Sequence, residues 1–142
     1  MLKGISPLIS PELIKVLMEM GHGDEIVLAD GNFPGASHGK LLVRCDGQPM
    51  PELLGAILDL FPLDPYVERP VSLMAVVPGD PVETPIWNTY KEIIANKTGN
   101  EEPFEHVERF QFYERAKQAY AVVMTGEKAL YANLILKKGV IS

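Results

Sequence analysis

The sequence has little cysteine, no long apolar run and no concentration of positive charge, and each absence excludes a class of protein. Cys45 is the only cysteine in the 142 residues, which excludes an intramolecular disulfide and a zinc site built from several cysteines. No apolar run reaches the roughly 18 to 20 residues that a membrane helix needs. The N-terminal segment also lacks the apolar core and cleavage site of a signal peptide. We therefore expect a cytoplasmic protein.

Net charge and missing motifs narrow the function further. The 13 basic and 19 acidic side chains give a formal net charge of −6, and the longest basic run is Lys137-Lys138. A nucleic acid or an anionic membrane is therefore not the expected partner. The glycine-rich loops of nucleotide-binding proteins, the GxSxG motif of esterases and the HExxH motif of zinc peptidases are all missing. We expect no cofactor and no metal ion.

What the sequence does contain is a regular alternation of helical and strand-like segments. A length of 142 residues with 46% hydrophobic residues fits a single domain, over 1–142. Apolar residues at helical spacing predict helices over 10–21, 50–61, 84–99 and 109–118. Apolar runs predict strands over 25–30, 41–45, 71–77, 119–126 and 131–138. Such an alternation predicts an α/β fold in which helices cover both faces of a mixed β-sheet.

Several residues are predicted to mark the ends of these segments. Ser10 is the expected N-cap of the first helix, and Gly21 is expected to end it in a left-handed conformation. Thr84 and Pro85 are expected to cap the third helix, which should end near Gly99. The glycine-rich stretch over 31–40 is predicted to be a loop.

Polar residues gather at the ends of the apolar segments, where α/β proteins tend to bind ligands. His22 has two interpretations: a turn residue at the end of the first helix, where the dipole favours a cation, or a general acid and base. Asp30 either terminates its strand or hydrogen-bonds hydroxyl groups. Arg109 is either a surface salt-bridge partner or part of a site. The remaining members of this polar set are Asp24, Tyr113, Glu114, Tyr131 and Asn133.

Other polar and aromatic residues are given structural roles. Tyr131 and Asn133 alternate, so in a strand they would share one face, either an exposed edge or the polar floor of a site. His38 and His106 are expected to be solvated, and with His22 they lack the spacing of metal ligands. Trp87 and Tyr90 are expected to be packing residues.

Four segments together resemble the fucose mutarotase branch of the fucose mutarotase and ribose pyranase family. They are LKGISPLISPELIKVLMEMGHGDEIVLADGNFP, VSLMAVV, RFQFYERAKQAYAVVMTGE and YANLILKKGV. The resemblance spans nearly the whole chain in the family's order. It implies a three-layer α/β/α domain around a mixed sheet, in ring assemblies that are often decamers of two stacked pentamers. It also implies a sugar site at a subunit boundary.

The resemblance further implies roles for individual residues. The family's proton donor corresponds to His22, its sugar-binding aspartate to Asp30 and its arginine to Arg109. The family's Tyr-x-Asn segment corresponds to Tyr131, Ala132 and Asn133. Ribose pyranases resemble each other in having histidine in the region of Arg109, so RFQFYER is the fucose form. The segments 35–45 and 81–107 depart most from the family pattern.

These roles imply an isomerase that interconverts the α and β anomers of L-fucopyranose without a cofactor. His22 would protonate the ring oxygen, and Tyr131 is a second candidate for proton transfer. Two alternatives are a ribose pyranase-like enzyme and a monosaccharide-binding protein without turnover. A glycosidase would need two carboxylates beside one bond, which Asp24 and Asp30 could supply only if the fold brought them together.

Overall fold

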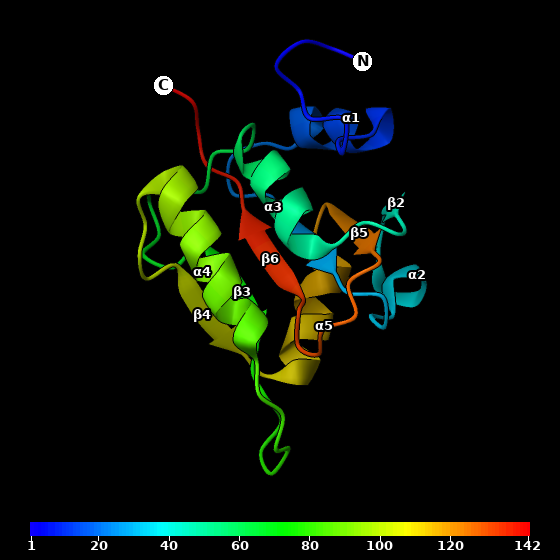
Figure 1. Cartoon of the computed structure of the whole chain (residues 1–142), viewed down its shortest axis with the longest axis vertical. Helices are drawn as coiled ribbons and strands as arrows, with labels where there is room; N and C mark the ends of the chain where they lie inside the picture. The colour runs from blue at the N-terminus through cyan, green and yellow to red at the C-terminus, as the bar shows by residue number, and fades with distance from the viewer.

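The computed structural model, which describes residues 1–142, places six strands in one sheet with helices on both sides (Figure 1). In chain order the elements are α1 (Pro11–Glu19), β1 (Glu25–Ala29), α2 (Gly35–His38), β2 (Leu42–Cys45), α3 (Met50–Leu58), β3 (Val71–Met74), α4 (Pro85–Thr98), β4 (Phe104–Val107), α5 (Arg109–Gln118), β5 (Ala121–Thr125) and β6 (Leu134–Lys137). None of the helices has both the length and the apolar character needed to cross a membrane.

The sheet is mixed because its last strand runs against all the others. The strand order is β2-β5-β1-β6-β3-β4. β6 pairs antiparallel with β1 and β3, and every other pair is parallel. The carboxyl ends of β1, β3, β4 and β5 therefore lie at the same edge of the sheet as the start of β6. Loops from distant parts of the chain meet at this edge.

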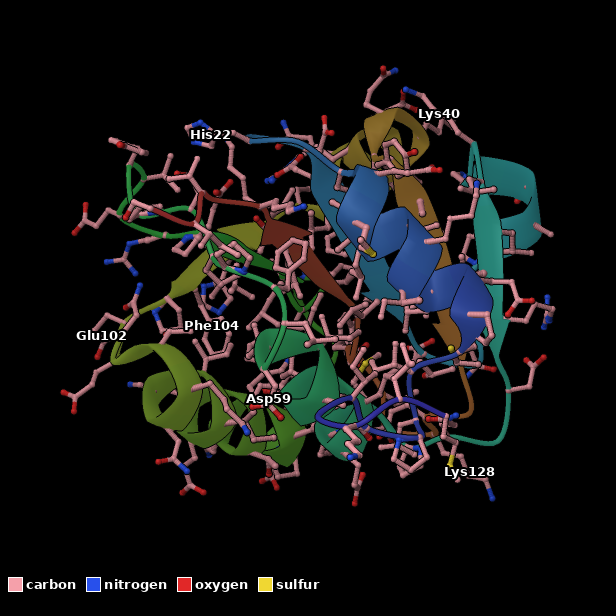
Figure 2. The ribbon with its side chains drawn as sticks, turned by 90° about the horizontal axis from the view of Figure 1, so that it is seen from above. His22, Lys40, Asp59, Glu102, Phe104 and Lys128 are labelled. Atoms are coloured by element: carbon pink, nitrogen blue, oxygen red, sulfur yellow. The ribbon has the colours of Figure 1, made fainter.

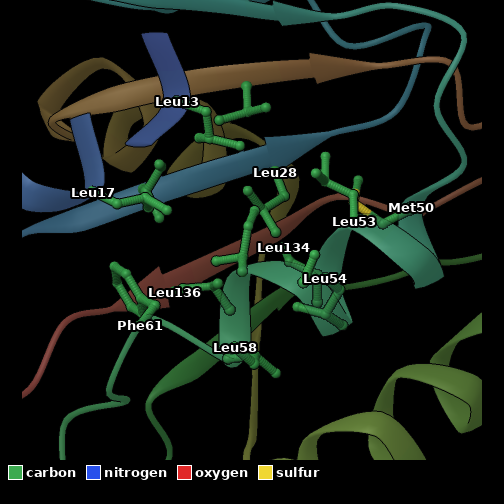
Figure 3. Close-up of a cluster of buried hydrophobic side chains, with 14 of the residues drawn as sticks. Leu13, Leu17, Leu28, Met50, Leu53, Leu54, Leu58, Phe61, Leu134 and Leu136 are labelled. Atoms are coloured by element: carbon green, nitrogen blue, oxygen red, sulfur yellow. The ribbon is translucent and has the colours of Figure 1, made fainter. Parts of the chain in front are cut away.

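Helices α1, α3 and α4 cover one face of the sheet. Alternate residues of β1 point to opposite faces, and Ile26 and Leu28 lie in the larger apolar cluster with residues of these helices. Figure 3 shows how leucines of α1 and α3 approach Leu28 of β1 and Leu134 of β6. Burying these leucines is the main contribution to stability on this face.

Helix α5 and the segment around α2 cover the opposite face. Val27 and Ala29 of β1 point to this side and lie in a smaller apolar cluster with Phe112 and Ala116 of α5. Phe33, just before α2, packs edge-on against Phe112. The predicted sheet with helices on both faces, a three-layer α/β/α arrangement, is confirmed.

Several local predictions are confirmed and others are wrong. Ser10 accepts a hydrogen bond from Leu13 N at 3.1 Å and caps α1, as predicted. Gly99 ends α4 in a left-handed conformation. Gly21 does not close α1, because the positive φ angle belongs to Gly23 in the following turn. Thr84 precedes α4, but its side chain makes no capping hydrogen bond.

Several elements and boundaries also differ from prediction. The expected loop over 31–40 contains the one-turn helix α2. An unpredicted strand, β4, lies at the sheet edge, where two of its four residues are exposed glutamate and histidine. The last strand begins at Leu134, so Tyr131 and Asn133 precede it and do not alternate along it. Tyr131 instead has a positive φ of 55°.

Candidate active site at the carboxyl edge of the sheet

A pocket of about 260 Å³ lies at the edge where the loops meet. This size is slightly below that of drug-binding pockets, which begin at about 300 Å³, and suits a small polar molecule. Five of the sequence-predicted residues line it together: Asp30, Arg109, Tyr113, Tyr131 and Asn133. The other lining residues are Asn32, Phe33, Met74, Val77, Asp80 and Leu130.

Asp30 is held where β1 ends. Its backbone N–H donates to Asn133 Oδ1 at 2.8 Å, and its own Oδ1 accepts from Asn32 N at 3.0 Å. The residue is 5% exposed. Burial raises the pKa of Asp30 above its usual value, although hydrogen bonds from backbone N–H groups oppose the shift. A carboxylate in this setting is a strong acceptor for a ligand hydroxyl because little water competes for it.

The backbone at Tyr131 is fixed from α4. The indole Nε1 of Trp87 donates to the carbonyl oxygen of Tyr131 at 2.7 Å. The hydroxyl of Tyr90 donates to the next carbonyl, that of Ala132, at 2.8 Å. Trp87 and Tyr90 therefore do more than pack, because they hold Tyr131 in the left-handed conformation that a bulky side chain rarely adopts.

Arg109 begins α5 and faces the pocket with an exposed guanidinium. Its Nε donates to the hydroxyl of Tyr113 at 3.1 Å, and this hydrogen bond raises the pKa of Arg109. The guanidinium carbon also lies 5.4 Å from the centre of the Phe110 ring. Arg109 forms no salt bridge within the chain. Its remaining N–H groups can donate to a ligand oxygen.

Residues that the sequence analysis missed complete the pocket. Met74, Val77 and Leu130 add apolar surface, and Asp80 adds a second carboxylate. The only local signal for Asp80 is the segment Val77-Pro78-Gly79-Asp80, which has the composition of a turn. The DGNFP segment, by contrast, is one of the motifs that carry the family resemblance. Its Asn32 and Phe33 line the pocket.

His22 lies at the opposite edge of the sheet, so within one chain it does not share a pocket with Asp30. It precedes β1, whereas Asp30 follows β1. Figure 2 shows His22 at the periphery of the molecule. Its side chain is 44% exposed, and its Nε2 lies 3.1 Å from Oδ1 of Asp64, which is 4% exposed. The resemblance assigns both residues to one sugar site, and within a single chain the structure separates them.

His22 is also not the cap of α1. Lys138 Nζ donates to the carbonyl oxygens of Leu17 and Met20 at 2.8 and 2.5 Å. Lys138 therefore supplies the hydrogen bonds that carbonyls at the end of the helix would otherwise lack. Burial acts to raise the pKa of Asp64, but the hydrogen bond from Tyr66 N and the adjacent His22 together bring it below its usual value. An ionised carboxylate thus fixes one ring nitrogen of His22 and leaves the other available.

The other candidates lie outside the pocket. Asp24 accepts a hydrogen bond from Gly21 N and precedes β1, so it is about 20 Å from Asp30 at the rise of an extended strand. A glycosidase needs its two carboxyl groups roughly 5 to 10 Å apart, which excludes this pair. Glu114 forms a surface ion pair with Lys117.

The two remaining histidines are packed against aromatic rings. The ring centre of His38 lies 5.2 Å from that of Tyr113, and His38 is half-buried, so it is only partly solvated. His106 lies 5.2 Å from the Trp87 ring but is exposed. No group of three or more histidine, cysteine, aspartate or glutamate side chains is arranged to hold a metal ion.

The pocket therefore combines hydrogen-bond acceptors, a cationic donor, a phenol and an apolar wall, which is a set that can bind a polyol. The model of the RbsD / FucU transport protein family matches residues 3–141. The chain belongs to this family. The RbsD / FucU relatives include the fucose mutarotase of Homo sapiens, which is 52% identical over 147 residues covering 99% of this chain and 95% of the relative.

Solved structures of RbsD / FucU proteins share the fold. The crystal structure of the fucose mutarotase in complex with L-fucose from Streptococcus pneumoniae has a TM-score of 0.94 and 54% identity, covering 99% of this chain and 100% of that chain. Bacillus subtilis RbsD complexed with D-ribose is more distant, with a TM-score of 0.74 and 26% identity over 100% of both chains. The resemblance read from the sequence is thus confirmed at the level of the family.

Proposed function

We propose that this chain is an isomerase that interconverts the α and β anomers of L-fucopyranose. The observation that carries the proposal is the pocket at the carboxyl edge of the sheet, in a chain 54% identical to a fucose mutarotase solved with L-fucose. We also propose that it acts on the free sugar in the cytoplasm.

Mutarotation opens the pyranose ring and closes it on the other face of the aldehyde. It requires a proton on the ring oxygen and removal of the proton from the anomeric hydroxyl, so an acid, a base and hydroxyl anchors are sufficient. Asp30 accepts hydrogen bonds from sugar hydroxyls, and the Asn133 amide can accept or donate them. The backbone of Ala132 lies between Tyr131 and Asn133. Arg109 binds hydroxyls and stabilises developing negative charge, and Tyr131 serves as the second proton-transfer group.

The proton donor in this proposal is His22 of a neighbouring copy. Two observations support a shared site: His22 lies at the opposite edge from the pocket of its own chain, and both are accessible. Contact between two different edges of identical chains is heterologous, and such contacts form a ring when the rotation from copy to copy closes. We therefore propose a ring assembly with one pocket at each boundary. The family resemblance implies that this ring assembly is a homodecamer of two stacked pentamers.

Saturation-transfer NMR tests the activity directly, because it reads the rate of exchange between the anomers of L-fucose with and without protein. We expect acceleration by the wild type and a rate about 10² to 10⁴ lower for H22A, which is the usual contribution of one positioned acid or base. Full exchange by H22A would remove His22 from the mechanism. Binding of L-fucose with unchanged exchange would indicate a binding protein.

A ribose pyranase-like activity is the second candidate, favoured by the structural similarity to the RbsD protein solved with D-ribose. The same measurement on D-ribose and L-rhamnose separates the two. Acceleration for L-fucose supports the first proposal, and acceleration confined to D-ribose supports the second.

A further inference from the structure

The hydroxyl of Tyr131 is hydrogen-bonded to a tight turn in the connection between β3 and α4. This connection projects beyond the body of the molecule in Figure 1. Asp80 N donates to Val77 O at 3.0 Å across this turn. Pro78 stands at its second position and Gly79, with φ +88°, at its third, which is the pattern of a type II turn. A Val-Pro-Gly-Asp segment is thus well suited to place residues 77 and 80 side by side.

Both ends of the turn bind the same oxygen atom. Tyr131 Oη donates its proton to Asp80 Oδ2 at 2.7 Å, and it accepts a hydrogen bond from Val77 N at 3.3 Å. A phenol has one proton to donate and two acceptor positions. Since the proton and one acceptor position are occupied, a bound sugar can only donate a hydrogen bond to Tyr131.

The backbone of Tyr131 is also fixed by a hydrogen bond. Trp87 fixes its backbone carbonyl, as described above, and the hydrogen bond to Asp80 raises the pKa of the phenol. Tyr131 therefore stays protonated, and it can remove a proton from a sugar only if it passes its own proton on. Asp80 lies where that proton would go.

We propose that Asp80 is a positioning residue that makes Tyr131 a base towards the anomeric hydroxyl. This inference rests on the proposed function. In ring opening, the anomeric O–H proton moves to Tyr131 Oη while the phenol proton moves to Asp80 Oδ2. The C1–O1 bond becomes a carbonyl as the bond between C1 and the ring oxygen breaks, and the ring oxygen takes a proton from the acid. Ring closure reverses each transfer.

The test compares D80N, Y131F and the double variant by anomer-exchange NMR over a range of L-fucose concentrations. The amide side chain in D80N has nearly the same shape and still accepts the phenol hydrogen bond, but it cannot take up the proton. We expect kcat to fall about 10- to 100-fold in D80N, up to the lower limit of the range for acid–base catalysis, with KM within about twofold. The double variant should be no slower than Y131F, because both changes break one relay.

The matched control is E83Q, which removes the same charge from an exposed residue of the same connection and should leave kcat and KM unchanged. A kcat for D80N near that of the wild type would show that the carboxylate only supports the turn. A raised KM with unchanged kcat would show that Asp80 binds sugar directly. Additive losses in the double variant would show independent roles. If the wild type itself does not accelerate exchange, the proposed function is wrong, and the proton relay is then wrong as well.

Discussion

Asp30 lies at the end of β1 with its surface almost fully covered, and backbone N–H groups donate to its carboxylate. Burial raises its pKa, so the folded chain binds this proton more tightly than the unfolded chain does. The carboxyl group therefore contributes stability below about pH 4, the unfolded value, and this contribution is lost as the pH rises through the folded value. At neutral pH the charge opposes folding.

D30N should separate stability from sugar binding. The amide side chain in D30N still offers an oxygen to Asn32 N but carries no charge, so this variant should unfold at a higher temperature than the wild type at pH 7. This advantage should shrink as the pH falls and disappear below about pH 4, where Asp30 becomes protonated in both states. Thermal unfolding from about pH 3 to 8 measures the effect. Lower stability of D30N at pH 7 would mean that the charge stabilises the fold.

The same variant should bind L-fucose more weakly. Hydrogen bonds to a charged group contribute about 1.5 to 3 kcal/mol, so we expect a loss of about 10- to 100-fold in affinity. A titration followed by NMR measures it, with S37A as a control on the exposed surface of α2. Unchanged affinity would exclude contact between Asp30 and the sugar.

Helix α4 supports the pocket from one layer away. Trp87 and Tyr90 are one turn apart on α4, and they donate to two consecutive carbonyls just before β6. Helix α4 thereby fixes the backbone segment just before β6 that contains Tyr131.

W87F tests this role of α4, since phenylalanine keeps an aromatic ring but lacks the indole N–H. We expect the free energy of unfolding to fall by about 1 to 2 kcal/mol, because the carbonyl of Tyr131 loses its donor. The exchange rate should also fall, by about tenfold, because the phenol is less well positioned. Denaturant unfolding and NMR exchange measure the two effects. The control N88A, on the exposed side of α4, should change neither quantity. A W87F variant with the stability and exchange rate of the wild type would show that α4 does not position Tyr131.

The elements differ in how far the sequence predicted them. Helix α1 and strand β1 were predictable because apolar spacing and capping residues agree over the same segments. Strand β4 was not, because its exposed glutamate and histidine reflect its place at the sheet edge, which depends on pairing with β3. The left-handed Tyr131 was also unpredictable, since donors distant in sequence impose it.

The pocket itself was partly predictable. Asp30 ends a predicted strand, so its place at the carboxyl edge follows from the fold class. Arg109 follows β4, which the sequence did not predict, so its place at the same edge did not follow. Tyr131 and Asn133 reach the same edge because β6 runs the other way. Asp80 was missed because its local sequence predicts only a turn. The separation of His22 from Asp30 was predictable, because the predicted strand over 25–30 lies between them. The binding of sugar by these residues stays a prediction.

At the scale of the whole molecule, a shared site makes a strong prediction about mixed assemblies. H22A lacks the donor, and R109A lacks part of the pocket, so each variant alone should be nearly inactive. In a ring that contains both at random, about one quarter of the boundaries join an intact pocket to an intact His22. We therefore expect co-expressed H22A and R109A chains to recover about that fraction of wild-type exchange activity.

The control is the double variant H22A/R109A co-expressed with either single variant, where no boundary joins two intact halves and activity should stay absent. Sedimentation at low micromolar concentration gives the state of assembly. A wild-type monomer with full activity, or mixed assemblies no more active than either parent, would contradict the shared site.

The central position of β6 also determines when the sheet can form during synthesis. β6 is the last strand of the chain, yet it lies between β1 and β3 and makes the only link between the group β2-β5-β1 and the pair β3-β4. A nascent chain that has not yet released residues 134–137 from the ribosome therefore holds two part-sheets, each with an unpaired inner edge. Such edges readily join other chains. Translation that stops shortly before Leu134 should thus produce aggregates and not a smaller folded protein.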